Sequence, residues 1–110
     1  MKIIKIKNLK SNVLEDLKER VKDFSCENLP NKDSYVLLTE NGKIIPCYIS
    51  IMGDEILSLR VDPTERGKGY AKFLVNSFPS VRYVTSLPSA LSFWHSLGFK
   101  NVSPYKLKRN

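Results

Sequence analysis

The sequence predicts an α/β (α+β) fold, with a mixed, mostly antiparallel sheet and helices on both of its faces. Short runs that alternate apolar and polar residues indicate strands, and other segments carry apolar residues at helical spacing. These elements follow one another in the order β-α-β-β-β-α-β-α-β. At 110 residues the chain can close one modest core, so we expect a single domain over residues 1–110.

The first two elements are a strand and an amphipathic helix. Residues 2–7 alternate well enough for a strand. Asn12 can then cap a helix, with Glu15 three residues later. This helix of about three turns would bury an apolar stripe that consists of Leu14, Leu17, Val21 and Phe24.

Three strands in a meander follow the polar segment "CENLPNKD". Residues 34–40 and 43–51 are rich in β-formers and flank an Asn-Gly step at Asn41 and Gly42, which is a strong hairpin signal. Pro46 predicts an irregular or edge position within the second of these strands. A turn at residues 52–54 then leads to a third strand over residues 55–61.

The remaining elements alternate helix and strand. Pro63 ends the third strand, and a glycine-containing turn precedes a helix with an apolar stripe that Pro79 ends. The stripe consists of Ala71, Leu74, Val75 and Phe78. The segment "VRYVT" is a short strand, and the next helix starts at Pro88 or Ser89 and stops at Gly98. From Phe99 onward we expect a last strand or a pair of short strands.

Composition narrows the class of protein. Apolar runs are far shorter than a membrane span, and the N-terminus does not resemble a signal peptide, so we expect a cytoplasmic protein with no membrane partner. Cys26 and Cys47 with a single histidine do not make a zinc site, so we expect no metal and two reduced thiols. The net charge of +7 suggests a nucleic acid, a phosphorylated cofactor or an acidic protein as partner, unless the lysines only solvate the surface.

The segment "VDPTERGKGYAKF", residues 61–73, has the features of an anion site. A strand that runs through a glycine turn into a helix leaves backbone N–H groups unpaired at the helix start. Gly67 and Gly69 allow close approach and positive φ, while Arg66, Lys68 and Lys72 add positive charge. From these residues alone, a plain turn without a ligand remains an open alternative.

Two motifs resemble those of the GNAT superfamily of N-acetyltransferases. The stretch "RGKGYA" is similar to the R/Q-x-x-G-x-G/A signature of that family, with Arg66, Gly69 and Ala71 in the specified places. The stretch "ALSFWHSLGF" resembles the later A-x-x-F-Y/W-x-x-x-G-F helix, with matches at Ala90, Phe93, Trp94, Gly98 and Phe99. One strand separates the motifs, as in the family, and the resemblance implies a small, GNAT-like fold.

The resemblance also implies a cosubstrate, acetyl-CoA, and residues to hold it. Its pyrophosphate would bind the loop, and the backbone of Leu59 and Val61 would pair with the amides of its pantetheine arm. The helix from Ser89 to Leu97 would flank the arm, with Ser89, Phe93 and Trp94 as contacts. The loop residues in this role are Arg66, Gly67, Lys68, Gly69, Tyr70 and Ala71.

By the same resemblance, the reaction is direct attack of a primary amine on the thioester, with Glu55 as the catalytic base. Glu55 lies eleven residues before Arg66, the spacing found in histone-type members. Simple alternation places it on the same side of the strand as Leu57, Leu59 and Val61. The alternative is an exposed carboxylate at the start of a strand.

The general acid is harder to assign. Trp94 stands where many members have a tyrosine, and an indole has no titratable hydroxyl. Tyr83, Ser86, Ser92 or water could protonate the thiolate instead, whereas His95 is expected on the surface. Leu87 also stands where the family often has an asparagine.

Three functions therefore remain in view. The first is an N-acetyltransferase acting on a small-molecule or protein amine. The second is a non-catalytic acetyl-CoA-binding regulatory module that acts on a partner protein. The third, a nucleic-acid-binding domain, is disfavoured because the basic residues are spread along the chain. The sequence leaves the identity of the amine and the formation of a homodimer open.

Overall fold

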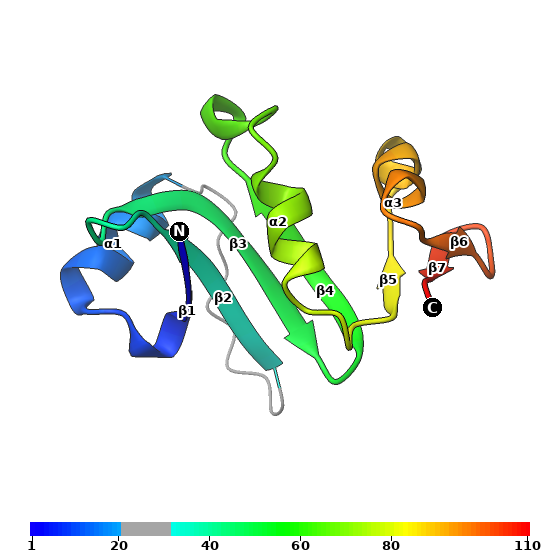
Figure 1. Cartoon of the computed structure of the whole chain (residues 1–110), viewed down its shortest axis with the longest axis horizontal. Coiled ribbons are helices and arrows are strands. Elements are labelled where there is room, and N and C mark those ends of the chain that lie inside the picture. Colours follow the sequence, from blue (N-terminus) through cyan, green and yellow to red (C-terminus); the bar gives the residue numbers. More distant parts are fainter. Residues whose placement is uncertain (21–31) are drawn as a thin grey trace.

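A computed structural model of the chain, which describes residues 1–20 and 32–110, contains a seven-stranded sheet (Figure 1). The strand order is β1-β2-β3-β4-β5-β7-β6, and only the β4–β5 pair is parallel. The prediction of a mixed, mostly antiparallel sheet is thus confirmed. The strands are β1 (Lys2–Lys5), β2 (Lys32–Leu38), β3 (Ile44–Met52), β4 (Glu55–Val61), β5 (Tyr83–Thr85), β6 (Lys100–Asn101) and β7 (Lys106–Lys108).

Helices lie on both faces of this sheet, as predicted. Helix α1 (Ser11–Arg20) covers one face, where Leu17 packs with Val36, Ile44 and Tyr48. Helices α2 (Tyr70–Asn76) and α3 (Leu91–Ser96) cover the other face, which holds the larger core (Figure 1). Single turns of 3₁₀ helix occur at η1 (Ile6–Asn8), η2 (Pro63–Glu65) and η3 (Pro88–Ala90).

The N-terminal elements differ from the prediction in their limits. The first strand ends at Lys5, because residues 6–8 form the 3₁₀ turn η1. Helix α1 begins at Ser11, so the predicted cap, Asn12, lies inside its first turn. Val21, Phe24 and most of the segment "CENLPNKD" lie outside the described residues, and its last two residues begin β2.

The turns of the meander are those that the sequence predicts. At the Asn-Gly step, Gly42 has a φ of 78°, and its N–H donates to the Thr39 carbonyl at 2.9 Å. Pro46 lies within β3 at an irregularity in the β2–β3 register, because Val36 pairs with Tyr48 while Leu37 pairs with Ile45. Since proline cannot donate a ladder hydrogen bond, this bulge is a position that it tolerates.

A second bulge lies in β4 and changes which residues share a face. Ser58 pairs with Ser50 and Ile56 with Ile51, so Leu57 has no partner on β3. Ile56 and Leu59 both belong to the core under α2 and α3, although they are three residues apart. The extra residue inverts the alternation between them.

The predicted placement of Glu55 beside Leu59 and Val61 is therefore wrong. Glu55 precedes the buried Ile56 and lies on the opposite face of the sheet from it. The expectation assumed unbroken alternation along the strand, which the bulge at Leu57 interrupts. Glu55 faces the same side as its register partner on β5, Tyr83.

Strands β4 and β5 pair only at one end. Their register contains Glu55 with Tyr83 and Ile56 with Val84, and no pair follows. Beyond Ile56 the two strands separate, so the β4 edge that faces β5 is unpaired from the bulge to Val61. This opening between two parallel strands is where the cavity described below lies.

The C-terminal residues fasten the end of the chain to α2 and the loop after it. The Arg109 guanidinium donates to the carbonyls of Val81 (2.8 Å), Phe78 (2.8 Å) and Val75 (3.3 Å). Burial lowers the pKa of Arg109, and the Phe99 ring lies 5.0 Å from its central carbon. Arg109, which directly follows β7, thus connects the C-terminal end of the chain to the C-terminal end of α2.

Two further observations bear on the class of protein. None of the helices within residues 1–20 and 32–110 is long and apolar enough to cross a membrane. Cys47 is fully buried as a free thiol, as expected for a reduced cysteine, and burial raises its pKa to about 12.

Candidate functional site

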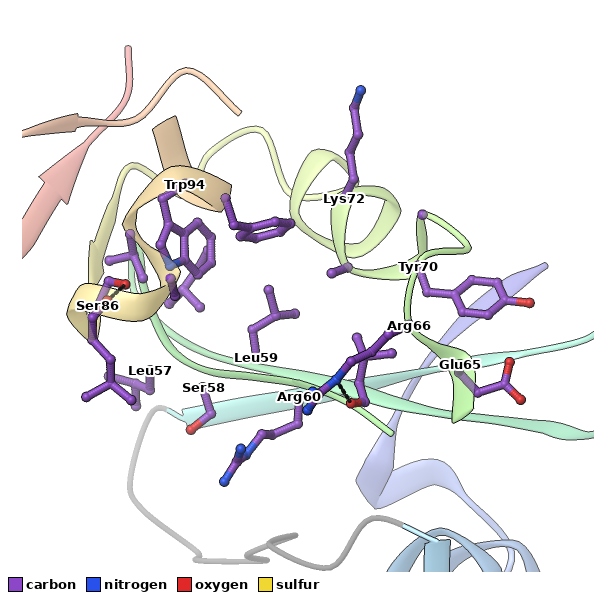
Figure 2. A pocket seen from close by; sticks show the side chains of 18 of the residues that line it. Leu57, Ser58, Leu59, Arg60, Glu65, Arg66, Tyr70, Lys72, Ser86 and Trp94 are labelled. Carbon is purple, nitrogen blue, oxygen red and sulfur yellow. Dashed lines mark hydrogen bonds between the residues drawn. The ribbon is translucent and has the colours of Figure 1, made fainter. Parts of the chain in front are cut away.

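A cavity of about 690 Å³ opens between β4, β5, the glycine loop and α3 (Figure 2). Its volume is within the range of small-molecule sites, roughly 300–1,000 Å³. The cavity has a charged end at the loop and an apolar end at α3. Nine of the residues predicted from the sequence line it: Leu59, Val61, Arg66, Gly67, Gly69, Tyr70, Ala71, Phe93 and Trp94.

The loop at the charged end is shaped by residues 62–69. The Asp62 side chain accepts from the N–H and hydroxyl of Thr64 and so holds η2 at the end of β4. Gly67 and Gly69 then have φ values of 82° and 84°, a conformation that L-residues rarely adopt. A Cβ built on either glycine would meet no heavy atom within 4 Å, so both glycines border open space.

This loop leaves a run of backbone donors unused. Within residues 1–20 and 32–110, the N–H groups from Gly67 to Lys72 have no hydrogen-bond acceptor, and the first helical N–H to donate is that of Phe73, to the Gly69 carbonyl at 3.0 Å. Unpaired N–H groups at a glycine turn and the following helix start bind anions. The loop at the charged end of the cavity thus has a run of unpaired backbone donors of the kind that an anion site needs.

The unpaired edge of β4 presents further backbone groups to the cavity. The Asp62 N–H donates to the Pro46 carbonyl on β3 at 2.9 Å. Because backbone groups alternate in direction along a strand, those of Val61 and Leu59 point to the opposite edge, away from β3. Arg66 Nε confirms this direction for Val61, because it donates to the Val61 carbonyl at 3.2 Å.

The cationic side chains around the loop differ in where they point. Arg66 lies along β4 at the cavity. Lys72 also lines the cavity, but the end of its side chain extends outward from α2 (Figure 2). Lys68 forms an ion pair with Glu65, Nζ to Oε2 at 2.8 Å, and this partner raises the pKa of Lys68. Lys68 does not line the cavity, so its predicted role rests on its backbone N–H rather than its side chain.

The apolar end lies between β4 and α3. Leu59 points toward Trp94, while Ser58 and Arg60 point to the other side of β4 (Figure 2). Trp94 is 5% exposed and packs edge to face against Phe93 at 5.0 Å and Phe99 at 5.3 Å. Trp94 is therefore both a core residue and part of the cavity wall.

Besides Lys68, two predicted site residues lie outside the cavity lining, Ser89 and Glu55. Ser89 is exposed in the turn η3, because the α-helix proper starts only at Leu91. Glu55 is half-buried on the opposite face, but Thr85 connects it to the cavity: Thr85 Oγ1 donates to Glu55 Oε1 at 3.5 Å, and Thr85 lines the cavity. Thr85 was missed in the sequence, where its only signal is its place at the end of a short strand.

Of the residues considered as general acids, only some line the cavity. Ser86 lines the cavity, is 8% exposed and donates its hydroxyl to the Leu87 carbonyl at 2.9 Å. Tyr83 and Ser92 do not line it, and the exposed His95 lies within 2.5 Å of the Asn101 amide oxygen. Leu87 lines the cavity and is 74% exposed, so an apolar side chain stands at the mouth.

A second cavity of about 590 Å³ lies between α1, the β2–β3 turn and the loop, and shares Glu65 and Tyr70 with the first. It contains neither the glycines of the loop nor the unpaired edge of β4. In the part of the chain that the structure describes, no group of three or more His, Cys, Asp or Glu side chains is placed to hold a metal ion.

Comparison with known proteins supports this fold. Neither a protein-family model nor a curated protein sequence matches the chain. Among solved structures, the candidate N-acetyltransferase YhhK of Escherichia coli, bound to coenzyme A, matches with a TM-score of 0.71 at 20% identity over 99% of this chain and 98% of that one.

Two further structures have the same arrangement. Tetrahymena GCN5 matches with a TM-score of 0.67 at 15% identity, over 99% of this chain and 95% of that one. A GNAT-family acetyltransferase of Staphylococcus aureus matches with a TM-score of 0.58 at 13% identity, over 94% of this chain and 80% of that one. The chain thus has the GNAT acetyltransferase fold across nearly its whole length, as the two sequence motifs predicted.

Proposed function

We propose that this chain is an acetyl-CoA-dependent N-acetyltransferase that transfers an acetyl group to a primary amine by direct attack on the thioester. The observation that carries the proposal is the polarity of the cavity between β4 and β5. Unpaired N–H groups from Gly67 to Lys72 lie at one end, and an apolar wall lies at the other. Acetyl-CoA has the same polarity, with phosphates at one end and an uncharged thioester arm at the other.

The residues present fit this cosubstrate. Arg66, Gly67, Lys68, Gly69, Tyr70 and Ala71 would hold the pyrophosphate, chiefly through backbone N–H groups at a loop whose glycines border open space. The outward-facing backbone of Leu59 and Val61 would pair with the amides of the arm, after Arg66 leaves or shares the Val61 carbonyl. Phe93 and Trp94 would line the apolar end.

Acetyl-CoA, when bound, supplies a thioester whose carbonyl carbon is open to attack by an amine. Glu55 would remove the proton that the amine carries, because an ammonium group cannot attack. Thr85 would hold Glu55 in place through their 3.5 Å hydrogen bond, at the wall that separates the carboxylate from the cavity. The amine would therefore approach from the Glu55 face of the sheet, and the cosubstrate from the cavity.

The departing thiolate needs a hydrogen-bond donor or a proton. Ser86 presents a hydroxyl in the cavity wall, whereas Tyr83 and Ser92 do not line it. We propose that Ser86 donates to the sulfur after turning away from the Leu87 carbonyl. Coenzyme A would then leave as the thiolate and take its proton from the solvent, and Ser86 would act only as a hydrogen-bond donor to the sulfur.

The experiment that tests this function separates binding from transfer. Isothermal calorimetry should show saturable, one-to-one binding of acetyl-CoA, with S-acetylpantetheine, which lacks the nucleotide and pyrophosphate, at least 10-fold weaker. Mass spectrometry should then detect acetylated product on a panel of primary amines. Equal affinities for the two thioesters would contradict the assignment of the loop.

A second function is favoured by one observation, the burial of Trp94 where the family often has a tyrosine. Such a chain would bind acetyl-CoA and regulate a partner protein without transfer. The same pair of measurements distinguishes the two functions, since acetyl-CoA binding without product on any amine would favour the regulatory module.

A further inference from the structure

One face of the sheet near β5 and β7 carries an unusual grouping of charges beside Glu55. Tyr83 pairs with Glu55 on β4 and with Lys108 on β7, and Thr85 pairs with Lys106. Because directly paired residues share a face, these side chains lie together, opposite the buried Val84 and Leu107. We call Tyr83, Lys106 and Lys108 the lysine–tyrosine surface.

Both lysines of this surface lean over the same aromatic ring. Lys106 Nζ lies 5.1 Å and Lys108 Nζ lies 5.6 Å from the centre of the Tyr83 ring. Lys100 extends the positive charge, because it pairs with Lys108 across β6 and β7. Two ammonium groups held near one ring repel each other, and an anion placed between them relieves that repulsion.

The cations of this surface are not neutralised by the described residues. Among residues 1–20 and 32–110, ion pairs form at Lys5 with Asp33 and at Lys68 with Glu65, and none involves Lys100, Lys106 or Lys108. Helix α1 lies over the other end of the sheet, near β1 to β3, and does not cover β5 to β7 (Figure 1). The helices near β5 to β7, α2 and α3, pack on the opposite face.

The position of this surface relative to Glu55 links it to the amine acceptor. Glu55 contacts Thr85, Thr85 is the register partner of Lys106, and Glu55 is the register partner of Tyr83. Neighbouring strands place directly opposite residues about 5 Å apart, so the backbone positions of Lys106 and Lys108 lie within about two strand spacings of Glu55. An acceptor whose amine reaches Glu55 from this face would therefore have Tyr83 and the two lysines beside it.

We propose that the acceptor is a small primary amine that also carries an anionic group, a phosphate or a carboxylate, which binds Lys106 and Lys108. This proposal rests on the proposed acetyltransferase function and names the substrate class of the same site. Glu55 would receive the amine end and the lysine–tyrosine surface the anionic end. The same lysines would repel a polycationic amine.

The test compares matched pairs of acceptors that differ in the anionic group alone. O-phosphoethanolamine is compared with ethanolamine, and glucosamine 6-phosphate with glucosamine. A carboxylate arm uses β-alanine against propylamine. The initial rate of acetyl transfer gives kcat/KM for each, and calorimetry with the protein saturated with coenzyme A gives Kd. We expect at least a 10-fold advantage in kcat/KM and Kd for one anionic member, because charge-assisted hydrogen bonds are the stronger kind.

Variants show whether the lysines are responsible. The double variant Lys106→Gln, Lys108→Gln should lower the ratio of kcat/KM for the anionic acceptor to that for the neutral one at least 10-fold. Its affinity for acetyl-CoA should stay unchanged. Lys7→Gln with Lys10→Gln removes the same charge from exposed positions near β1, at the opposite edge of the sheet, and should change neither quantity. The advantage should also shrink as salt is raised, since these charges are exposed to solvent.

The outcomes separate the two proposals. Acetyl-CoA binding with equal transfer to charged and neutral amines overturns the acceptor class and leaves the transferase function in place. A preference for anionic amines that survives in the Lys106/Lys108 variant overturns the role of this surface. Absence of acetyl-CoA binding overturns the proposed function itself, and the acceptor assignment with it.

Discussion

Replacing Gly69 by alanine should damage both the fold and the cosubstrate site, to extents that can be estimated. Gly69 has a φ of 84°, and an L-residue in this left-handed region costs about 1–2 kcal/mol of folding free energy. No heavy atom lies within 4 Å of the added Cβ, so the cost is backbone strain without a clash. The added methyl would project beside the unpaired N–H groups that we assign to the pyrophosphate. Loss of one charge-assisted hydrogen bond, about 1.5–3 kcal/mol, would weaken acetyl-CoA binding roughly 10- to 150-fold.

Gly42→Ala is the matched control for this prediction. Gly42 has a φ of 78° and equally open surroundings, but it lies in the β2–β3 turn and does not line the cavity between β4 and β5. Urea denaturation should show a similar loss of about 1–2 kcal/mol for both variants. Calorimetry should show weaker acetyl-CoA binding for Gly69→Ala alone. If both variants bind acetyl-CoA as tightly as the parent, the assignment of the loop is refuted.

Three further predictions concern the base, the C-terminal anchor and the buried thiol. Glu55→Gln should keep the Kd for acetyl-CoA within a factor of two and lower kcat/KM about 10²- to 10⁴-fold near neutral pH. The loss should shrink at higher pH, where the amine is already deprotonated. If kcat/KM of the variant and of the parent depend on pH in the same way, Glu55 is not the base. Arg109→Ala should lower the free energy of unfolding by about 2–3 kcal/mol, because it removes charge-assisted hydrogen bonds to three carbonyls. Urea denaturation measures this loss, and a loss below about 0.5 kcal/mol would show that the fold does not depend on Arg109. Burial raises the pKa of Cys47 from 9.0 to about 12, so at pH 8 it should have roughly a thousandfold less thiolate than an ordinary cysteine. Peptide mapping should therefore find Cys47 unlabelled by iodoacetamide in the native protein and labelled in urea.

The features that the sequence predicts well are those that depend on neighbouring residues. The Asn-Gly turn at Gly42, the irregularity at Pro46 and the glycine loop at Gly67 and Gly69 follow from the limits that glycine and proline place on backbone angles. The order of elements, and with it the fold class, follows from local periodicity in the same way. These predictions need no knowledge of what the segment packs against.

The face on which Glu55 lies could not be predicted, because it depends on the bulge at Leu57. Nothing in "EILSLRV" marks that residue as the one without a partner on β3. The insertion is visible only in the pairing with β3, a contact between segments that turn at Gly53. One extra residue in the strand was enough to make the sequence-based placement of Glu55 wrong by one face of the sheet.

Contacts between distant segments were also out of reach. Arg109 appears in the sequence as part of a basic C-terminus, yet it binds carbonyls of residues 75, 78 and 81. The contact of Thr85 with Glu55 spans thirty residues, and the convergence of Lys106 and Lys108 on Tyr83 depends on the β5–β7 register. Such partners are set by strand order, which local patterns do not specify.

The most direct test of the account is an amide NMR titration of the protein with acetyl-CoA. We predict saturable shifts for the N–H groups from Gly67 to Lys72 and for Leu59 and Val61 on β4. Residues of β1, at the far edge of the sheet, should be unaffected. Absence of shifts at millimolar acetyl-CoA, or shifts confined to the second cavity around Asn12 and Gly42, would contradict the claim that the β4–β5 cavity is the acetyl-CoA site.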